Sequence, residues 1–142
     1  KLPALERLEV WFGARDRGGT ARIDDLKPLL DGTAFPSLRH LGLRNAELTH
    51  DIVTTLPASK IAARLESLDL SMGTLDVEEA GILAASRAKF PKLKTLDVGA
   101  SYLTPAAVRA LKTAFKGVTV SAKNPKEYYD WAPDERFVSV HE

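Results

Sequence analysis

Apolar residues return along the chain in one pattern, and this pattern predicts the main structural elements. The clearest copy occupies residues 93–104 and reads L-x-x-L-x-[LV]-x-x-small-x-L-[TD]. Further copies occupy residues 65–76 and 38–49, and the first half of the pattern is present at 5–13 and, degraded, at 115–121. Leucines that alternate with polar residues are typical of a strand with one buried face. Each copy therefore predicts one short strand.

The spacing between copies leaves room for a helix after most strands. Their first apolar residues are 33, 27, 28 and 22 residues apart, and they are Leu5, Leu38, Leu65, Leu93 and Phe115. A period near 28 residues accommodates both a strand and a helix in each unit. The chain is therefore expected to contain about four and a half strand–helix units.

Capping residues mark where these helices begin. Thr49, Asp76 and Thr104 each precede a helical stretch, and their side-chain oxygens can accept hydrogen bonds from the free N–H groups of a first turn. Glu79 follows three residues after Asp76, which is a variant of the capping box. The expected helices cover about 50–56, 77–88 and 105–115, with a shorter one at about 24–31 that has Pro28 in its first turn.

Two segments depart from the repeat. Residues 13–20 combine paired glycines with mixed charges, which predicts a surface loop inserted into the first unit. Residues 123–142 form a polar tail with interleaved aromatic side chains. The last unit of a repeat array leaves an apolar end open, so this tail is expected to cover it. The alternative is a detached peptide motif that another protein reads.

The leucine columns resemble the ribonuclease-inhibitor-like class of leucine-rich-repeat proteins over residues 2 to about 122. The resemblance implies an α/β solenoid, a right-handed βα superhelix with a parallel sheet on the concave face and helices on the convex face. It also implies protein binding, but not ribonuclease inhibition, which belongs to a much longer horseshoe. The segment 68–75 and the ending 136–140 look like stretches of uncharacterised bacterial leucine-rich-repeat proteins. The repeat domain is accordingly placed at 1–122 and the capping tail at 123–142.

The residues between the leucines should face the concave side and form ladders across the sheet. One ladder places Asp69 directly beside Asp97. Like charges side by side on a sheet are unfavourable unless another group compensates them. They are either two solvated carboxylates or a contact for a partner's basic group. Carboxylate-pair catalysis is disfavoured because the sequence shows no acid–base partner for them.

A second feature of this face is the pair Trp11-Phe12, which should lie beside Arg44. Tryptophan and arginine are the residue types most enriched among binding hot spots. The alternative is that one aromatic ring packs under the loop at 13–20 or against an upstream repeat. The partner-binding residues predicted for the concave face are Trp11, Phe12, His40, Arg44, Asp69, Met72 and Asp97.

Composition narrows the function further. The 142 residues include 20 basic and 19 acidic side chains, so net charge does not favour a nucleic acid or a membrane as partner. The absence of cysteine fits a reducing, cytoplasmic setting and excludes thiolate metal ligands. His40, His50 and His141 lack ligand spacing, so no metal site is expected. No catalytic residue and no cofactor site is predicted either.

These observations favour a non-enzymatic protein-protein interaction module, monomeric, whose partner the sequence does not identify. The chain starts at Lys1 and runs directly into the unit at Leu5 without a polar first cap. That beginning motivates two alternatives. The chain could be the targeting or regulatory arm of an enzyme whose catalytic domain lies upstream, or it could pack on its own N-terminal repeats.

Overall fold

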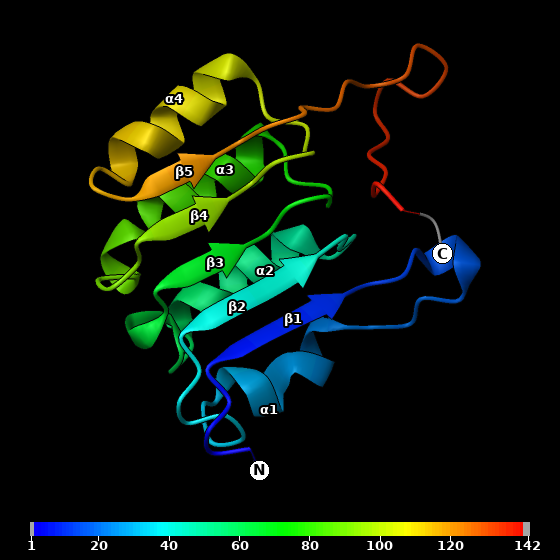
Figure 1. Cartoon of the computed structure of the whole chain (residues 1–142). Coiled ribbons are helices and arrows are strands. Elements are labelled where there is room, and N and C mark those ends of the chain that lie inside the picture. Colours follow the sequence, from blue (N-terminus) through cyan, green and yellow to red (C-terminus); the bar gives the residue numbers. More distant parts are fainter. Residues whose placement is uncertain (1, 141–142) are drawn as a thin grey trace.

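The computed structural model describes residues 2–140, which form an α/β structure around one parallel sheet (Figure 1). The five strands are hydrogen-bonded in the order in which they occur along the chain. They are β1 (Arg7–Trp11), β2 (His40–Arg44), β3 (Ser67–Asp69), β4 (Thr95–Asp97) and β5 (Thr119–Ser121). Each parallel pair is joined by a crossover that runs over the same face of the sheet, which leaves the other face uncovered.

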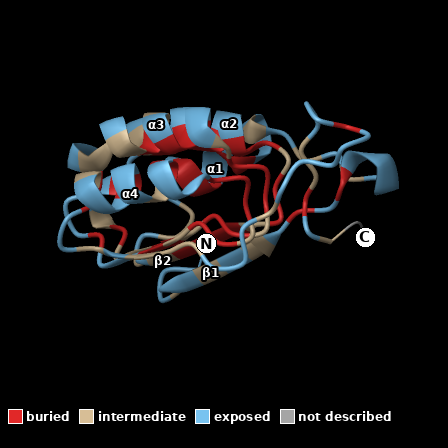
Figure 2. Ribbon diagram, turned by 90° about the horizontal axis from the view of Figure 1, so that it is seen from above, coloured by how far each residue is buried: buried red, intermediate tan, exposed pale blue. Residues whose placement is uncertain are grey.

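Four helices lie on that one face, and the core is the layer between helices and strands (Figure 2). They are α1 (Lys27–Leu30), α2 (Thr49–Thr55), α3 (Val77–Ala85) and α4 (Pro105–Ala114). The expected positions of these helices are confirmed to within a few residues; the first is preceded by a single 3-10 turn, Ile23–Leu26. Among the described residues, none of the helices has both the length and the apolar character required to cross a lipid bilayer.

The core is built from the leucine columns. The leucines of β2, β3 and β4, together with Leu70 and Val98 directly after β3 and β4, point toward the helices and are at most 2% exposed. Phe90 and Phe115 are completely buried where helices end. In β1 the equivalent residues Leu8 and Val10 are only half-buried, because this strand is the edge of the sheet. Burial of these apolar side chains is the main contribution to the stability of the fold.

The register predicted for the first four strands is confirmed, whereas that of the fifth is wrong by two residues. Asp69 pairs with Asp97 as expected, but Thr119 lies opposite Thr95, whereas a copy that starts at Phe115 would place Gly117 there. Gly117 has φ +88° and turns the chain between α4 and β5, so β5 starts two residues later. Glycine adopts this left-handed conformation without steric cost.

The capping predictions hold for two of three helices. Thr104 accepts a hydrogen bond from the N–H of Ala107, and Asp76 and Glu79 form the capping box of α3. Thr49 is not a cap: it is the first residue of α2, and its hydroxyl group lies 2.7 Å from that of Thr74. That contact joins two neighbouring units instead of ending one helix.

The tail, which was predicted to cover the end of the last unit, extends across several units. It runs back along the sheet edge at which the strands end, passing β4, β3 and β2 in turn (Figure 1). The N–H of Lys126 donates to the carbonyl of Ser101, and that of Ser139 donates to the carbonyl of Met72. Val140 exchanges two hydrogen bonds with the side chain of Asn45. The tail is therefore a strap across the units, held by backbone and side-chain contacts.

Candidate functional site

The uncovered side of the sheet, here called the open face, carries the alternating residues of each strand, and it is the face predicted to be concave. In β1 these residues are Arg7, Glu9 and Trp11, all exposed. Trp11 is 50% exposed, whereas Phe12 is 7% exposed and belongs to the core. The prediction that Phe12 contributes to the binding face is therefore corrected. Side chains alternate along the chain here, so Phe12 points to the same side as Leu8 and Val10, toward the helices.

Arg44 is the centre of the open face. Its guanidinium carbon lies 4.4 Å from the centre of the Trp11 ring. Its Nη1 atom lies 3.1 Å from a Glu9 carboxylate oxygen, and its Nε atom lies 3.3 Å from one of Asp69. The same Nε donates to the Ser71 hydroxyl at 3.1 Å. One arginine thus joins residues of three neighbouring units, which fixes the Trp11 ring against the sheet.

The contacts around Arg44 hold Glu9 ionised. The Trp11 indole N–H donates to the Glu9 carboxylate, and Arg44 donates to the same oxygen. These hydrogen bonds lower the pKa of Glu9 below its ordinary value. The arrangement orients the polar edge of the Trp11 ring toward Glu9 and leaves the residue 50% exposed to solvent.

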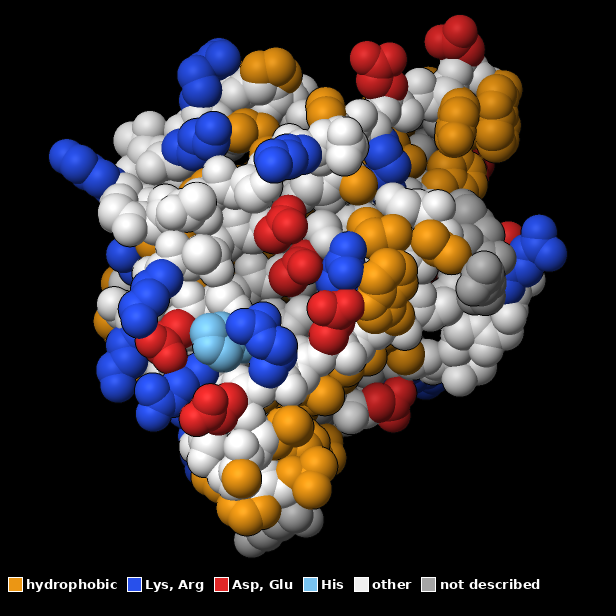
Figure 3. All heavy atoms as spheres, viewed as in Figure 1, with side chains coloured by type: hydrophobic (Ala, Val, Ile, Leu, Met, Phe, Trp, Pro, Cys, Tyr) orange, Lys and Arg blue, Asp and Glu red, His pale blue; other side chains and the backbone are white. Residues whose placement is uncertain are grey.

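Asp69 and Asp97 are in register on neighbouring strands, but their surroundings differ. Each accepts a hydrogen bond from the N–H two residues later, at 2.9 Å from Ser71 and 2.8 Å from Gly99. Asp69 also pairs with Arg44. Within residues 2–140, Asp97 has no ion pair. The open face therefore presents one uncompensated carboxylate beside a compensated one, and acidic side chains gather around one basic side chain at its centre (Figure 3).

The remaining predicted residues of this face lie at its borders. The Nδ1 atom of His40 lies 2.8 Å from the Ser67 hydroxyl, so these two residues of adjacent strands are linked. Met72 is half-buried, and its sulfur lies 3.1 Å from the Nη2 atom of Arg44. Met72 also has φ +67°, a left-handed conformation. Both side chains support the polar network and offer less accessible area than Trp11.

A second polar cluster lies under the tail and was missed at the level of sequence. Glu79 is 1% exposed, and one of its oxygens accepts hydrogen bonds from Arg136 at 2.8 Å and from the N–H of Asp76 at 2.9 Å. Burial by itself would raise the pKa of Glu79, but these hydrogen bonds outweigh it and hold the pKa below its ordinary value. The cluster anchors the tail to α3. No local sequence pattern in the tail predicts this contact.

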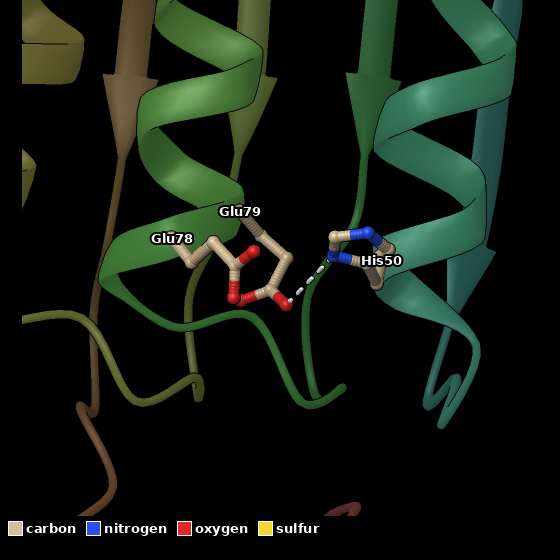
Figure 4. A group of neighbouring side chains, drawn as sticks. All are labelled: His50, Glu78 and Glu79. Carbon is tan, nitrogen blue, oxygen red and sulfur yellow. Dashed lines mark ion pairs between the residues drawn. The ribbon is translucent and has the colours of Figure 1, made fainter.

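His50 approaches the other oxygen of Glu79 at the start of α2, with Glu78 beside them (Figure 4). The His50 Nδ1 atom lies 3.5 Å from Glu79, and one ligand atom from each residue lies within 4.8 Å of the others. The sequence did not predict this group. Glu79 already serves Arg136 and the cap of α3, and a cation at a helix N-terminus opposes the helix dipole. We assign the group to the ion-pair network of the tail. His141 lies outside the described residues.

Comparison with known proteins identifies a related structure but no assigned activity. No protein-family model matches the chain, and no curated protein does. The crystal structure of a Bacteroides fragilis protein, a Northeast Structural Genomics Consortium target, superposes with a TM-score of 0.82 at 28% sequence identity. The match covers 89% of this chain and 36% of that chain, so the present chain spans about a third of its relative.

Proposed function

We propose that the chain is a leucine-rich-repeat protein of the ribonuclease-inhibitor-like class. On this proposal, its five parallel strands and their crossovers are successive turns of a right-handed solenoid. Support comes from the leucine columns, which fill the core at equivalent positions of four units, and from a strand order that follows the chain. In repeat proteins of this kind each unit contacts only its neighbours, and the stacked units together bury a continuous core.

The function proposed for it is non-enzymatic recognition of a protein partner through the open face. The observation that carries this proposal is Trp11, a half-exposed aromatic ring held in place by Arg44 on the sheet. A rigid aromatic anchor loses little conformational entropy on binding. Asp97 adds an uncompensated carboxylate, which fits a partner that presents a basic side chain beside an apolar one.

The proposal is tested by comparing proteins captured by the wild-type chain and by a Trp11→Ala/Asp69→Ala variant, quantified by mass spectrometry. The matched control is Trp131→Ala/Asp134→Ala, which removes another exposed tryptophan and aspartate from the tail. A partner that depends on the open face is lost from the first variant and retained by the control. Equal capture by wild type and both variants rules out the open face as the binding surface.

A further inference from the structure

The edge of the sheet at which the strands begin is rich in basic side chains, although the chain as a whole is nearly neutral. The segments that lead from each helix into the next strand, together with residues 2–7, carry nine basic side chains and three acidic ones. The acidic ones are Glu6, Asp31 and Glu66. The basic ones, here called the basic edge, are Arg7, Arg39, Lys60, Arg64, Arg87, Lys89, Lys92, Lys94 and Lys116. Basic side chains gather on this side of the molecule in Figure 3.

Helix capping explains only part of this edge. Lysine and arginine near a helix C-terminus interact favourably with the helix dipole, which accounts for Arg87 and Lys116. Arg39, Lys92 and Lys94 lie directly before strands and belong to no helix. All three are exposed. Parallel strands bring their amino ends to one edge, so these charges accumulate there without a stabilising role for the helices.

The basic edge contains a recess. Its volume is about 400 Å³, and its lining comprises Pro36, Ser37, Leu38, Arg39, Arg64, Glu66 and Lys92. Arg64 is held in place because its Nη2 atom donates to the carbonyls of Gly32 and Phe35. Its Nε atom is buried and has no hydrogen-bond partner among the residues that the structure describes. Arg64 thus retains hydrogen-bonding capacity at the wall of the recess that no described residue of the chain uses.

The carboxylate in the recess does not neutralise it. Glu66 lies 2.6 Å from the Lys94 ammonium group and 3.7 Å from the Arg39 guanidinium group, so two cations share it. Within the described part of the chain, neither Arg64 nor Lys92 forms an ion pair. The recess thus keeps a net positive charge after its internal pairing.

We propose that the basic edge is a second interaction surface, separate from the open face, that binds an acidic peptide segment. One carboxylate or phosphate group of that segment sits in the recess between Arg39, Arg64 and Lys92, and flanking acidic groups meet the remaining lysines. Clusters of arginine and lysine recognise acidic and phosphorylated motifs in this way.

The composition of the recess favours a peptide over a nucleic acid. No aromatic side chain lines it, so it offers no surface on which bases stack. Glu66, in the middle of the cations, repels a continuous phosphate backbone, whereas a peptide can place its separate anionic groups on either side.

The experiment measures fluorescence anisotropy of short labelled peptides with the whole chain at low ionic strength. A glutamate-rich peptide is compared with its glutamine counterpart and with a version in which phosphoserine replaces the glutamates. We expect binding of the glutamate and phosphoserine peptides that weakens with salt, and none of the glutamine peptide. Whichever anionic peptide binds more tightly identifies carboxylate or phosphate as the recognised group.

The decisive variant is Arg39→Ala/Lys92→Ala, with Lys27→Ala/Lys123→Ala as control for the same loss of charge from exposed positions elsewhere. The first should weaken peptide binding about tenfold, the effect of two exposed ion pairs. The control should change it less than about twofold. Equal losses in both variants overturn the proposal, as does tighter binding of single-stranded DNA or of anionic vesicles. The Trp11→Ala/Asp69→Ala variant should bind these peptides normally, which separates this test from that of the open face.

Discussion

The guanidinium carbon of Arg44 lies 4.4 Å from the centre of the Trp11 ring, across the pair formed by β1 and β2. The same arginine also pairs with Glu9 and Asp69, so the guanidinium group on which the ring stacks is itself held in place. A tryptophan that would otherwise move freely on an exposed edge strand is thereby held as a rigid contact surface. This relationship determines what the open face can present to a partner.

A double-mutant cycle measures that relationship. Trp11→Ala and Arg44→Ala should show a coupling free energy of about 0.5–1 kcal/mol, the size of a cation–π contact at an exposed site. Chemical denaturation of the two single variants and the double variant provides the values. Arg44→Lys should recover little of the loss, because a lysine ammonium group lacks the planar fork that stacks on the ring and reaches two carboxylates. Additive effects of the two changes would contradict the stacking role.

Asp69 and Asp97 should respond in opposite directions to removal of their charge. Asp97→Asn relieves repulsion from a neighbour and should stabilise the fold by about 0.2–0.5 kcal/mol. Asp69→Asn loses an ion pair with Arg44 and should destabilise it by up to about 1 kcal/mol. Unfolding by urea at low and high salt checks both, since salt screens each effect. Stability changes of the same sign would show that the pair does not interact as its register suggests.

The repeat made most of the fold predictable because the same core position is occupied by an apolar residue in several successive units. Leu41, Leu68 and Leu96 could be aligned from spacing alone, and the alignment carries the paired register of Asp69 and Asp97 with it. Where the repeat weakens, prediction failed for local reasons. Gly117 uses a left-handed turn that the spacing of β5 does not reveal.

The candidate site was predictable in its positions but not in its contacts. The ladder places Trp11 beside Arg44, whereas the alternation that exposes Trp11 directs Phe12 to the side of Leu8 and Val10, against the prediction for Phe12. The contact between Arg136 and Glu79 joins residues 57 positions apart, and no periodic pattern connects the tail to α3. The basic edge was hidden for a different reason. The net charge is a sum over the whole molecule and does not show where the charges lie. The basic residues are far apart in the sequence, and they come to one edge only when the parallel sheet has formed.

The ion pair between Glu79 and Arg136 predicts a stability that depends on pH. Arg136→Met leaves a buried carboxylate without its partner and should cost about 2 kcal/mol, below the range for fully buried pairs because Arg136 is part-exposed. Since the pKa of Glu79 is lowered on folding, its contribution is present above the unfolded pKa of about 4.3 and is lost as pH falls through the folded value. Acid unfolding monitored by circular dichroism measures both effects. In Glu79→Gln/Arg136→Met most of the loss should be recovered, and no recovery would contradict the pairing.

Left-handed residues follow several strands, and one of them offers a test of backbone strain. Ala100 has φ +49°, a conformation that costs a side-chain-bearing residue about 1–2 kcal/mol. Ala100→Gly should therefore stabilise the chain by up to about 1 kcal/mol after the greater flexibility of glycine in the unfolded chain is included. Ala110→Gly, at an exposed position of α4, is the matched control and should destabilise by about 1 kcal/mol. Thermal unfolding distinguishes the two, and a loss of stability in both would contradict the assigned turn.

Lys126 joins the tail to the third unit and should make stability rise with pH in the alkaline range. Its ammonium group donates to the carbonyls of Gly73 at 2.8 Å and Phe137 at 2.6 Å, and burial lowers its pKa to about 8. The unfolded chain retains an ordinary lysine pKa of about 10.4, so between these values it binds more protons than the folded chain. The free energy of unfolding therefore increases with pH over that interval.

Urea unfolding from pH about 7.5 to 10 tests this increase. The Lys126→Met variant should show no increase with pH. It should also be less stable than the wild-type chain at all pH values, because both carbonyls lose their donor. The measurement must stay below about pH 10, where the raised pKa of Tyr128 (about 12) begins to act in the opposite direction. A flat profile in the wild-type chain would show that the ammonium group is solvated and that the tail is held by its other contacts.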